Sequence, residues 1–153
     1  MASGFWYLED GRCFARNVAW MTHLLKMIIR EMKELPAAEL FCQYLEQFVP
    51  DSESEFNGYG GFIRKKTGEN IMMVFDLREF TPENQNYFWR ASQQALKKLV
   101  IQADSPAAED VFLLKKLLDM HKRIIQGEAP EKLSDTGSYI EPYSGKKVGP
   151  GWI

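Results

Sequence analysis

Histidine and cysteine, the side chains that most often bind metals or act as nucleophiles, are scarce in this 153-residue chain. It contains His23, His121, Cys13 and Cys42, all far apart in the sequence. No CxxC pair and no spacing typical of a zinc site connects them. We therefore expect no metal and no cofactor, and we interpret the histidines as structural or surface residues and both cysteines as buried free thiols.

Asp76, Arg78 and Glu79 are the next group that could do chemistry, at the end of an expected strand. Alternate residues of a strand share a face, so Asp76 and Arg78 should point the same way, opposite to Phe75 and Leu77. An acid and a cation so placed could form part of an active site. A solvated face or an intramolecular ion pair is the other interpretation, and the more common one.

A glycine-rich segment, Gly58-x-Gly60-Gly61, resembles a phosphate-binding loop only superficially. No Lys-Ser or Lys-Thr pair follows at the right distance, and a strand is expected where a phosphate loop would lead into a helix. This segment predicts a turn.

Composition excludes several classes of function. With 45% hydrophobic and 26% charged residues the chain is typical of one globular domain, and no apolar run approaches the ~18 to 20 residues that cross a bilayer. Residues 1–5 have no basic start, so we expect a cytoplasmic protein and no export. A net charge of −2 gives no general attraction to nucleic acid.

Two hairpins are expected to position these residues. Residues 5–8 and 13–16 flank Asp10-Gly11, a strong hairpin signal. Residues 62–66 and 71–78 flank Thr67-Gly68-Glu69-Asn70, whose glycine suits a tight turn.

Four helices complete the domain, at about 18–35, 37–49, 82–103 and from Asp104 or Ser105 to Gly127. Thr81 should cap the third, with Pro82 at its first position and Glu83 in its first turn. The apolar stripes expected to face the core are Met21, Leu24, Leu25, Ile28, Met32 and Leu35; Leu40, Phe41, Tyr44, Leu45 and Phe48; Phe88, Ala91, Ala95, Leu96 and Leu99; and Val111, Leu114, Leu117, Leu118, His121, Ile124 and Ile125.

The order of elements predicts an α+β fold, with a small, mostly antiparallel sheet built from the two hairpins and packed against about four helices. Residues 1–127 should form a single domain. Residues 128–153, rich in glycine and proline but also in apolar groups, should form an irregular tail packed on that domain.

Three segments carry a resemblance to a known family: GFWYLEDGRCFA at 4–15, GGFIR at 60–64 and FDLREFTPEN at 75–84. Over residues up to about 127 the chain resembles small bacterial immunity proteins, which neutralise polymorphic toxins such as those of contact-dependent growth inhibition. The resemblance implies a cytoplasmic protein that inhibits a cognate toxin by stoichiometric binding. Such toxins are often nucleases, and in the narrower expectation this one is a transfer-RNA nuclease. It carries over no catalytic residue, so we expect a protein that is not an enzyme.

A nuclease needs a positive surface for phosphates, so its inhibitor should present carboxylates around aromatic anchors. The acidic loop after Pro50 and the central hairpin supply such residues, and a simple solvated loop is the alternative interpretation. We expect the toxin to contact Asp51, Glu53, Glu55, Phe56, Tyr59 and Glu69.

Two other functions stay open. One is a small cytoplasmic enzyme in which folding gathers Asp76, Arg78, Glu79 and His121; the other is a general protein-binding adaptor. The expected partner is a protein toxin with a basic surface, with no direct nucleic acid and no membrane, and a homodimer is left open.

Overall fold

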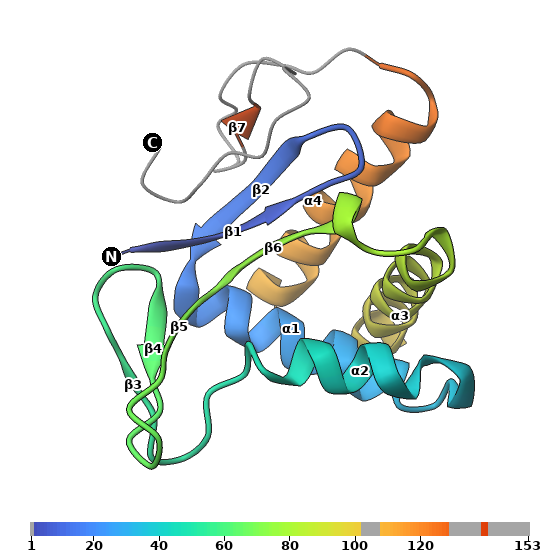
Figure 1. Cartoon of the computed structure of the whole chain (residues 1–153). Helices are drawn as coiled ribbons and strands as arrows, with labels where there is room; N and C mark the ends of the chain where they lie inside the picture. Colours follow the sequence, from blue (N-terminus) through green and yellow to red (C-terminus); the bar gives the residue numbers. More distant parts are fainter. Residues whose placement is uncertain (1, 102–107, 129–138, 141–153) are drawn as a thin grey trace.

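The computed structural model describes residues 2–101, 108–128 and 139–140. The described part of the chain forms helices and two small sheets, an α+β fold as predicted (Figure 1). In chain order the elements are β1 Ser3–Tyr7, β2 Arg12–Asn17, α1 Val18–Met32, the 3₁₀ turn η1 Pro36–Ala38, α2 Glu39–Glu46, β3 Glu55–Phe56, β4 Gly61–Ile63, β5 Asn70–Met72, β6 Val74–Asp76, the 3₁₀ turn η2 Leu77–Glu79, α3 Pro82–Ile101, α4 Ala108–Ile125 and β7 Tyr139–Ile140.

The larger sheet has the strand order β6-β1-β2-β7. Strands β1 and β2 form the predicted antiparallel hairpin, with Phe5 opposite Ala15. Strand β6 adds to the other side of β1 in parallel, with Phe5 opposite Val74, and β7 pairs antiparallel with β2. This sheet therefore joins strands that are widely separated in the sequence.

The smaller sheet, with the order β3-β4-β5, is entirely antiparallel. The two predicted hairpins were expected to share one sheet, and the run 71–78 was expected to be one strand. Instead the chain divides at Met73, so that β5 pairs with β4 while β6 pairs with β1. Met73 joins the two sheets because its amide donates to Gly60 O (2.9 Å) and its carbonyl accepts from Phe5 N (2.8 Å).

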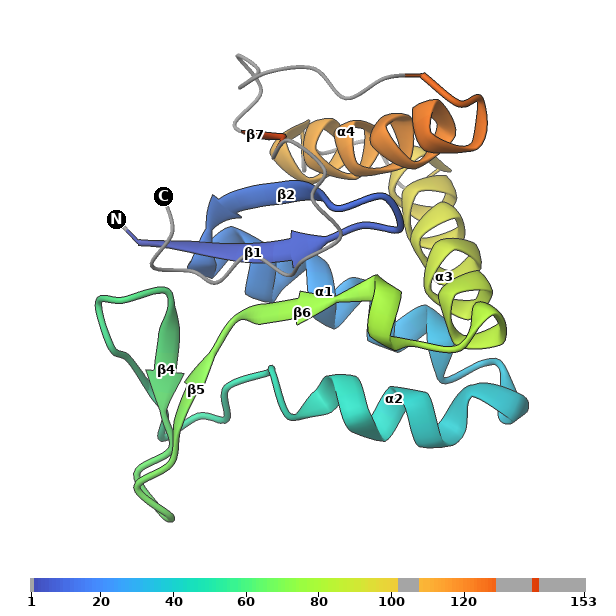
Figure 2. The ribbon, with the colours of Figure 1, turned by 45° about the horizontal axis from the view of Figure 1, so that its top comes forward.

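Helix α1 packs on the β1–β2 hairpin and also contacts α2 and α3, and α4 packs on α3. Figure 2 shows these helices gathered beside the larger sheet, with the smaller sheet standing apart from α3 and α4. The core is aromatic where sheet and helices meet: Trp6 stacks on Phe75 with ring centroids 5.0 Å apart, and Phe88 meets Trp6 edge-on at 6.0 Å. The stripe expected along α1 is buried, apart from the half-buried Leu35.

Three residues predicted to face the core are exposed instead: Leu40, Tyr44 and Ile125. Helix α2 is only eight residues long, and it buries one narrow face made by Phe41, Cys42 and Leu45. Leu40 lies beside that face with 81% of its surface accessible. Ile125 is the last residue of α4 and remains exposed.

The predicted start of the third helix is confirmed, since Thr81 Oγ1 accepts a hydrogen bond from Asn84 N (3.1 Å) and Pro82 begins α3. Asp104 and Ser105, predicted to cap the fourth helix, lie outside the described residues. So does most of the predicted irregular tail, although Tyr139–Ile140 forms the short strand β7. Within the described ranges, no helix combines the length and apolar character that a membrane span needs.

Candidate functional site

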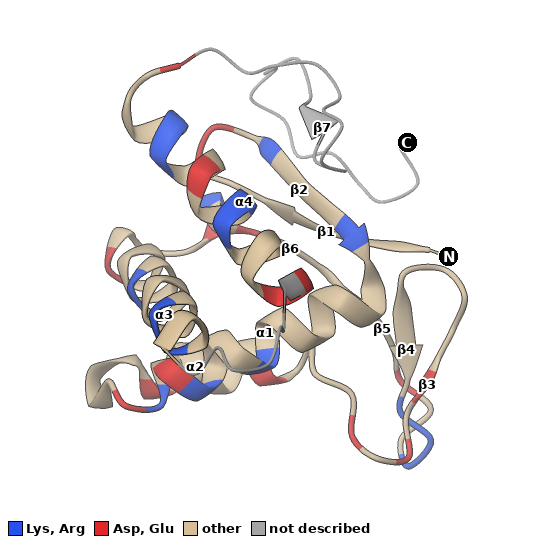
Figure 3. Cartoon of the chain, turned by 180° about the vertical axis from the view of Figure 1, so that it is seen from behind, with Lys and Arg blue, Asp and Glu red and all other residues tan. Residues whose placement is uncertain are grey.

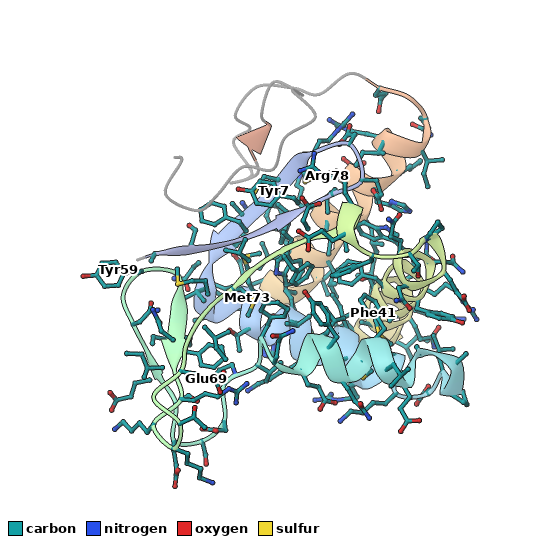
Figure 4. All side chains as sticks on the ribbon, in the orientation of Figure 1. Tyr7, Phe41, Tyr59, Glu69, Met73 and Arg78 are labelled. Atoms are coloured by element: carbon teal, nitrogen blue, oxygen red, sulfur yellow. The ribbon has the colours of Figure 1, made fainter. Side chains whose placement is uncertain are left out.

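The six residues predicted to meet a partner all lie in or beside the smaller sheet, and all are exposed. Glu55 and Phe56 form β3, while Tyr59 lies in the turn between β3 and β4. Glu69 immediately precedes β5, and Asp51 and Glu53 lie in the loop before β3. Folding therefore places the six on one projecting element, with Tyr59 at the end nearer β1 and Glu69 at the opposite end (Figure 4).

Tyr59 stands at the tip of a rigid turn. Asn57 Oδ1 accepts from Tyr59 N (2.7 Å) and Gly61 N (3.1 Å), and Asn57 Nδ2 donates to Asn70 Oδ1 (2.6 Å). Gly60 has a φ of +96°, and a β-carbon there would lie 2.3 Å from Ser3 O of β1. The turn is thus closed by backbone contacts that only glycine permits, while the Tyr59 side chain is 79% exposed and points away from the body (Figure 4).

The loop before β3 is organised by Asp51. Its Oδ1 accepts from Ser54 Oγ (2.9 Å) and from Glu53 N (3.0 Å). These hydrogen bonds, that from Ser54 first, lower the pKa of Asp51 below its ordinary value. The Asp51 carboxylate therefore shapes the loop and is not simply displayed to solvent.

Basic side chains of the same sheet pair with most of these carboxylates. Lys65 Nζ lies 2.6 Å from Glu55 Oε1, Lys66 Nζ lies 3.9 Å from Glu53 Oε2, and Arg64 Nη1 lies 3.7 Å from Asp51 Oδ2. Positive and negative residues alternate at the end of this sheet that carries the turn between β4 and β5 (Figure 3). Residues 51–69 carry four carboxylates and three cations, so the formal charge of this element is only −1.

The alternative site at Asp76, Arg78 and Glu79 has a different geometry from the one predicted. The strand ends at Asp76, whose Oδ1 caps η2 by accepting from Arg78 N (2.9 Å). Arg78 then folds back, so that its Nε and Nη2 reach the Asp76 carboxylate at 3.0 and 2.8 Å. Asp76 is 5% exposed, and this pair fits the interpretation as an intramolecular ion pair.

No family model, curated protein or solved structure matches this chain. The resemblance to immunity proteins therefore stays a prediction. The candidate site is defined by its own geometry: an exposed tyrosine on a turn fixed by hydrogen bonds, an exposed phenylalanine on the preceding strand and paired charges at the opposite end of the sheet.

The histidines and cysteines occupy separate places. His23 Nε2 lies 2.9 Å from Asp110 Oδ2, and His121 contacts Glu9, not the group at Asp76. Cys13 and Cys42 are buried free thiols, as predicted. Burial, aided by Glu46, raises the pKa of the Cys42 thiol and so favours its unreactive form. Across the described ranges, no three His, Cys, Asp or Glu side chains converge as metal ligands would.

Two features of the candidate site escaped sequence reasoning. The pairing of Lys65 and Lys66 with the acidic residues depends on the register of β3 against β4, in which Glu55 lies opposite Ile63. Ile63 itself is 40% exposed and adds an apolar group to the opposite face of the sheet from Phe56. The acidic residues in 51–55 and the basic residues in 64–66 form a cross-strand charge pattern. This pattern is the signal that could have indicated the ion pairs.

Proposed function

We propose that this protein is an immunity protein, which binds a cognate bacterial toxin domain and neutralises it by stoichiometric protein–protein inhibition. The smaller sheet is the proposed contact surface, and the toxin is proposed to be a nuclease, in the narrower case a transfer-RNA nuclease. The observation that carries the proposal is Tyr59, an exposed aromatic side chain on a turn fixed by Asn57 and Gly60.

A fixed aromatic residue is well suited to bind another protein. Tyrosine offers a large contact area, and tyrosines are enriched among the few residues that dominate interface energies. Ordering a loop during binding costs free energy, and a turn already held by hydrogen bonds avoids that cost. Phe56, 53% exposed on the strand before the turn, extends the apolar contact.

The charges at the other end of the smaller sheet from Tyr59 can serve recognition even though they are paired within the chain. Exposed ion pairs contribute only about 0 to 1 kcal/mol each, so a cationic partner can replace Lys65 or Lys66 beside a carboxylate at little cost. A nuclease surface that binds phosphate would offer such cations. Because the net charge of the sheet is small, we expect steering by charge to be modest and anchoring by Tyr59 to dominate.

The test is co-expression with the product of the adjacent gene, followed by co-purification, cell survival and surface-binding kinetics. Tyr59→Ala should speed dissociation and weaken the complex by about tenfold or more, because a buried aromatic anchor is lost. Tyr44→Ala removes a half-exposed tyrosine from α2 and is the matched control; we expect it to leave binding unchanged.

Charge is tested separately by Glu53→Gln, Glu55→Gln and Glu69→Gln together, which spares Asp51 because that residue shapes the loop. This triple variant should slow association at low salt, and the difference should vanish near ~1 M salt, where the Debye length is about 3 Å. Unchanged kinetics in both the Tyr59 and the triple variant would exclude this surface. Stable binding of that gene product without protection of cells would favour a general adaptor instead.

A further inference from the structure

A groove of about 530 Å³ lies at the end of the molecule away from the smaller sheet. It is formed where the β1–β2 turn, helix α3 and the C-terminal half of α4 meet (Figure 1). The β1–β2 turn contributes Glu9, helix α3 contributes Trp89 and Arg90, and helix α4 contributes His121. Its remaining walls combine apolar side chains with carboxamides: Pro82, Ile124 and Ile125, and Gln85, Asn86 and Gln93.

The carboxylate of Glu9 is the central polar group of this groove. Its Oε1 accepts a hydrogen bond from the Trp89 indole Nε1 and lies 3.4 Å from His121 Nδ1. The His121 and Trp89 rings stack in parallel, with centroids 3.9 Å apart. Three segments far apart in the sequence therefore hold one carboxylate in a fixed position.

The second oxygen of this carboxylate, Oε2, is buried and has no hydrogen-bond partner among the residues that the structure describes. A buried acceptor without a donor is costly, and more so when it carries charge. The Glu9 side chain as a whole is 21% exposed and lines the groove, although the atom Oε2 itself is covered. A ligand with N–H donors in the groove would satisfy this acceptor once the carboxylate turns Oε2 towards it.

Glu9 is held in its charged form. Burial acts to raise its pKa, but the adjacent His121, the Glu9 backbone amide and the hydrogen bond from the Trp89 indole together outweigh burial, so the pKa lies below its ordinary value. The groove therefore presents an anion at neutral pH.

Neighbouring groups also favour a donor-rich ligand. When neutral His121 carries its proton on Nδ1, towards Glu9, its Nε2 is left as an acceptor. Asn86 and Gln93 can each turn an amide oxygen towards a donor. The apolar walls at Pro82, Ile124 and Ile125 suit an aliphatic chain attached to the cationic group.

We propose that this groove binds a guanidinium or ammonium group carried on an aliphatic chain, with Glu9 as its counter-ion. The site is independent of the toxin-binding surface proposed above, which lies on the other sheet. Arg90 also lines the groove and opposes a cation, but it is exposed, so water screens its charge far more than that of Glu9. Both an arginine or lysine side chain of a protein and a free aliphatic amine have the required chemistry.

The experiment uses the full chain labelled with ¹⁵N, because the Trp89 indole N–H that bonds to Glu9 gives its own NMR signal, assigned through Trp89→Phe. Capped arginine (N-acetyl-L-arginine N-methylamide) and agmatine are the two probes. The matching citrulline derivative, with a neutral urea in place of the guanidinium, is the ligand control. We expect saturable shifts of the Trp89 signal with the cations and none with citrulline.

Two variants should change the affinity for the cation in opposite directions. Glu9→Gln should weaken cation binding by at least about tenfold, since a hydrogen bond between charged partners is lost. Arg90→Gln, an exposed change that should not disturb folding, should strengthen it by about two- to threefold because a repulsive charge is removed. Tighter binding of capped arginine would indicate a protein side chain as the ligand, and tighter binding of agmatine would indicate a free amine.

Three results would overturn the proposal. The first is the absence of a saturable Trp89 shift with either cation in the folded wild-type protein. The second is a citrulline response equal to that of arginine, which would exclude recognition by charge even if Glu9→Gln failed to fold. The third is weaker cation binding by Arg90→Gln, because neither probe carries an anionic group that Arg90 could attract.

Discussion

The two sheets of this protein differ in what covers them. The larger sheet buries Trp6, Phe14 and Phe75 against helices, and even its other face carries buried side chains such as Tyr7. The smaller sheet buries Phe62 but exposes Phe56, Tyr59 and Ile63. The larger sheet has buried side chains on both faces, whereas the smaller sheet is joined to the body at Met73 and through Arg64, which donates to Gln47 O and Val49 O.

This difference separates stability from recognition. Substitutions in the larger sheet and its helices should lower the free energy of unfolding, because they remove buried contacts. Substitutions on the smaller sheet should change binding instead, since its apolar side chains already face solvent. Each prediction below measures how complete that separation is.

The largest effect is expected in the body. Leu25 is fully buried on α1, and Leu25→Ala should lower the free energy of unfolding by about 2 to 5 kcal/mol. Leu40→Ala makes the same chemical change on the exposed side of α2 and should stay within about 0.5 kcal/mol. Chemical denaturation of both variants provides the measurement, and equal losses would mean that burial does not distinguish the two positions.

The next effect lies at the junction between the sheets. Gly60→Ala forces a side chain into a positive φ and against Ser3 O of β1, and should cost about 1 to 3 kcal/mol. Gly58 also has a positive φ but no neighbour within 4 Å, so Gly58→Ala should cost only about 1 kcal/mol of backbone strain. If both variants lose the same stability in denaturation, the contact between the turn and β1 is not what holds the smaller sheet in place.

A smaller effect, dependent on pH, is expected at Glu9. Its pKa in the folded protein is lowered, so the ionised carboxylate contributes stability that is complete above the ordinary value of 4.5 and is lost as pH falls through the lower folded value. Glu9→Gln should therefore be less stable than the wild type at neutral pH, and the gap should close in acid. Urea unfolding at several pH values measures this gap, and a constant gap would exclude the ionised form as its source.

The smallest effect on stability is expected at the tip of the smaller sheet. Tyr59→Ala should change the free energy of unfolding by less than about 0.5 kcal/mol, although the same variant should weaken toxin binding. A thermal denaturation series that includes Phe56→Ala checks the point. A loss of unfolding free energy comparable to that of Leu25→Ala would show that the smaller sheet is part of the core. The contrast between a stabilising sheet and a binding sheet would then be wrong.

The parts of the fold that could be predicted are those set by neighbours in the sequence. The turn at Asp10-Gly11, the apolar stripe of α1 and the cap at Thr81 each depend on residues within a few positions. The division of 71–78 into two strands depends instead on β1. Residues 74–76 pair with residues 5–7 of β1, so they do not continue β5 in the smaller sheet. No local pattern contains that information.

The same reasoning applies to the sites. The segment that carries Phe56 and Tyr59 could be found from its composition, but its ion pairs depend on cross-strand register. The groove around Glu9 was missed because Glu9 looks like an ordinary turn residue. Trp89 is brought to it by tertiary packing, as is His121 from a third segment. Leu40 was assigned to the core because a short helix can show an apolar stripe wider than the face it buries.

The parallel pairing of β1 with β6 also sets an order for folding. The β1–β2 hairpin is made first by the ribosome, yet the free edge of β1 stays open until residues 74–76 have been synthesised. Pairing between such distant segments slows folding, and an open strand edge can capture the edge of another chain. Cellular yield should therefore depend on how soon β6 reaches β1.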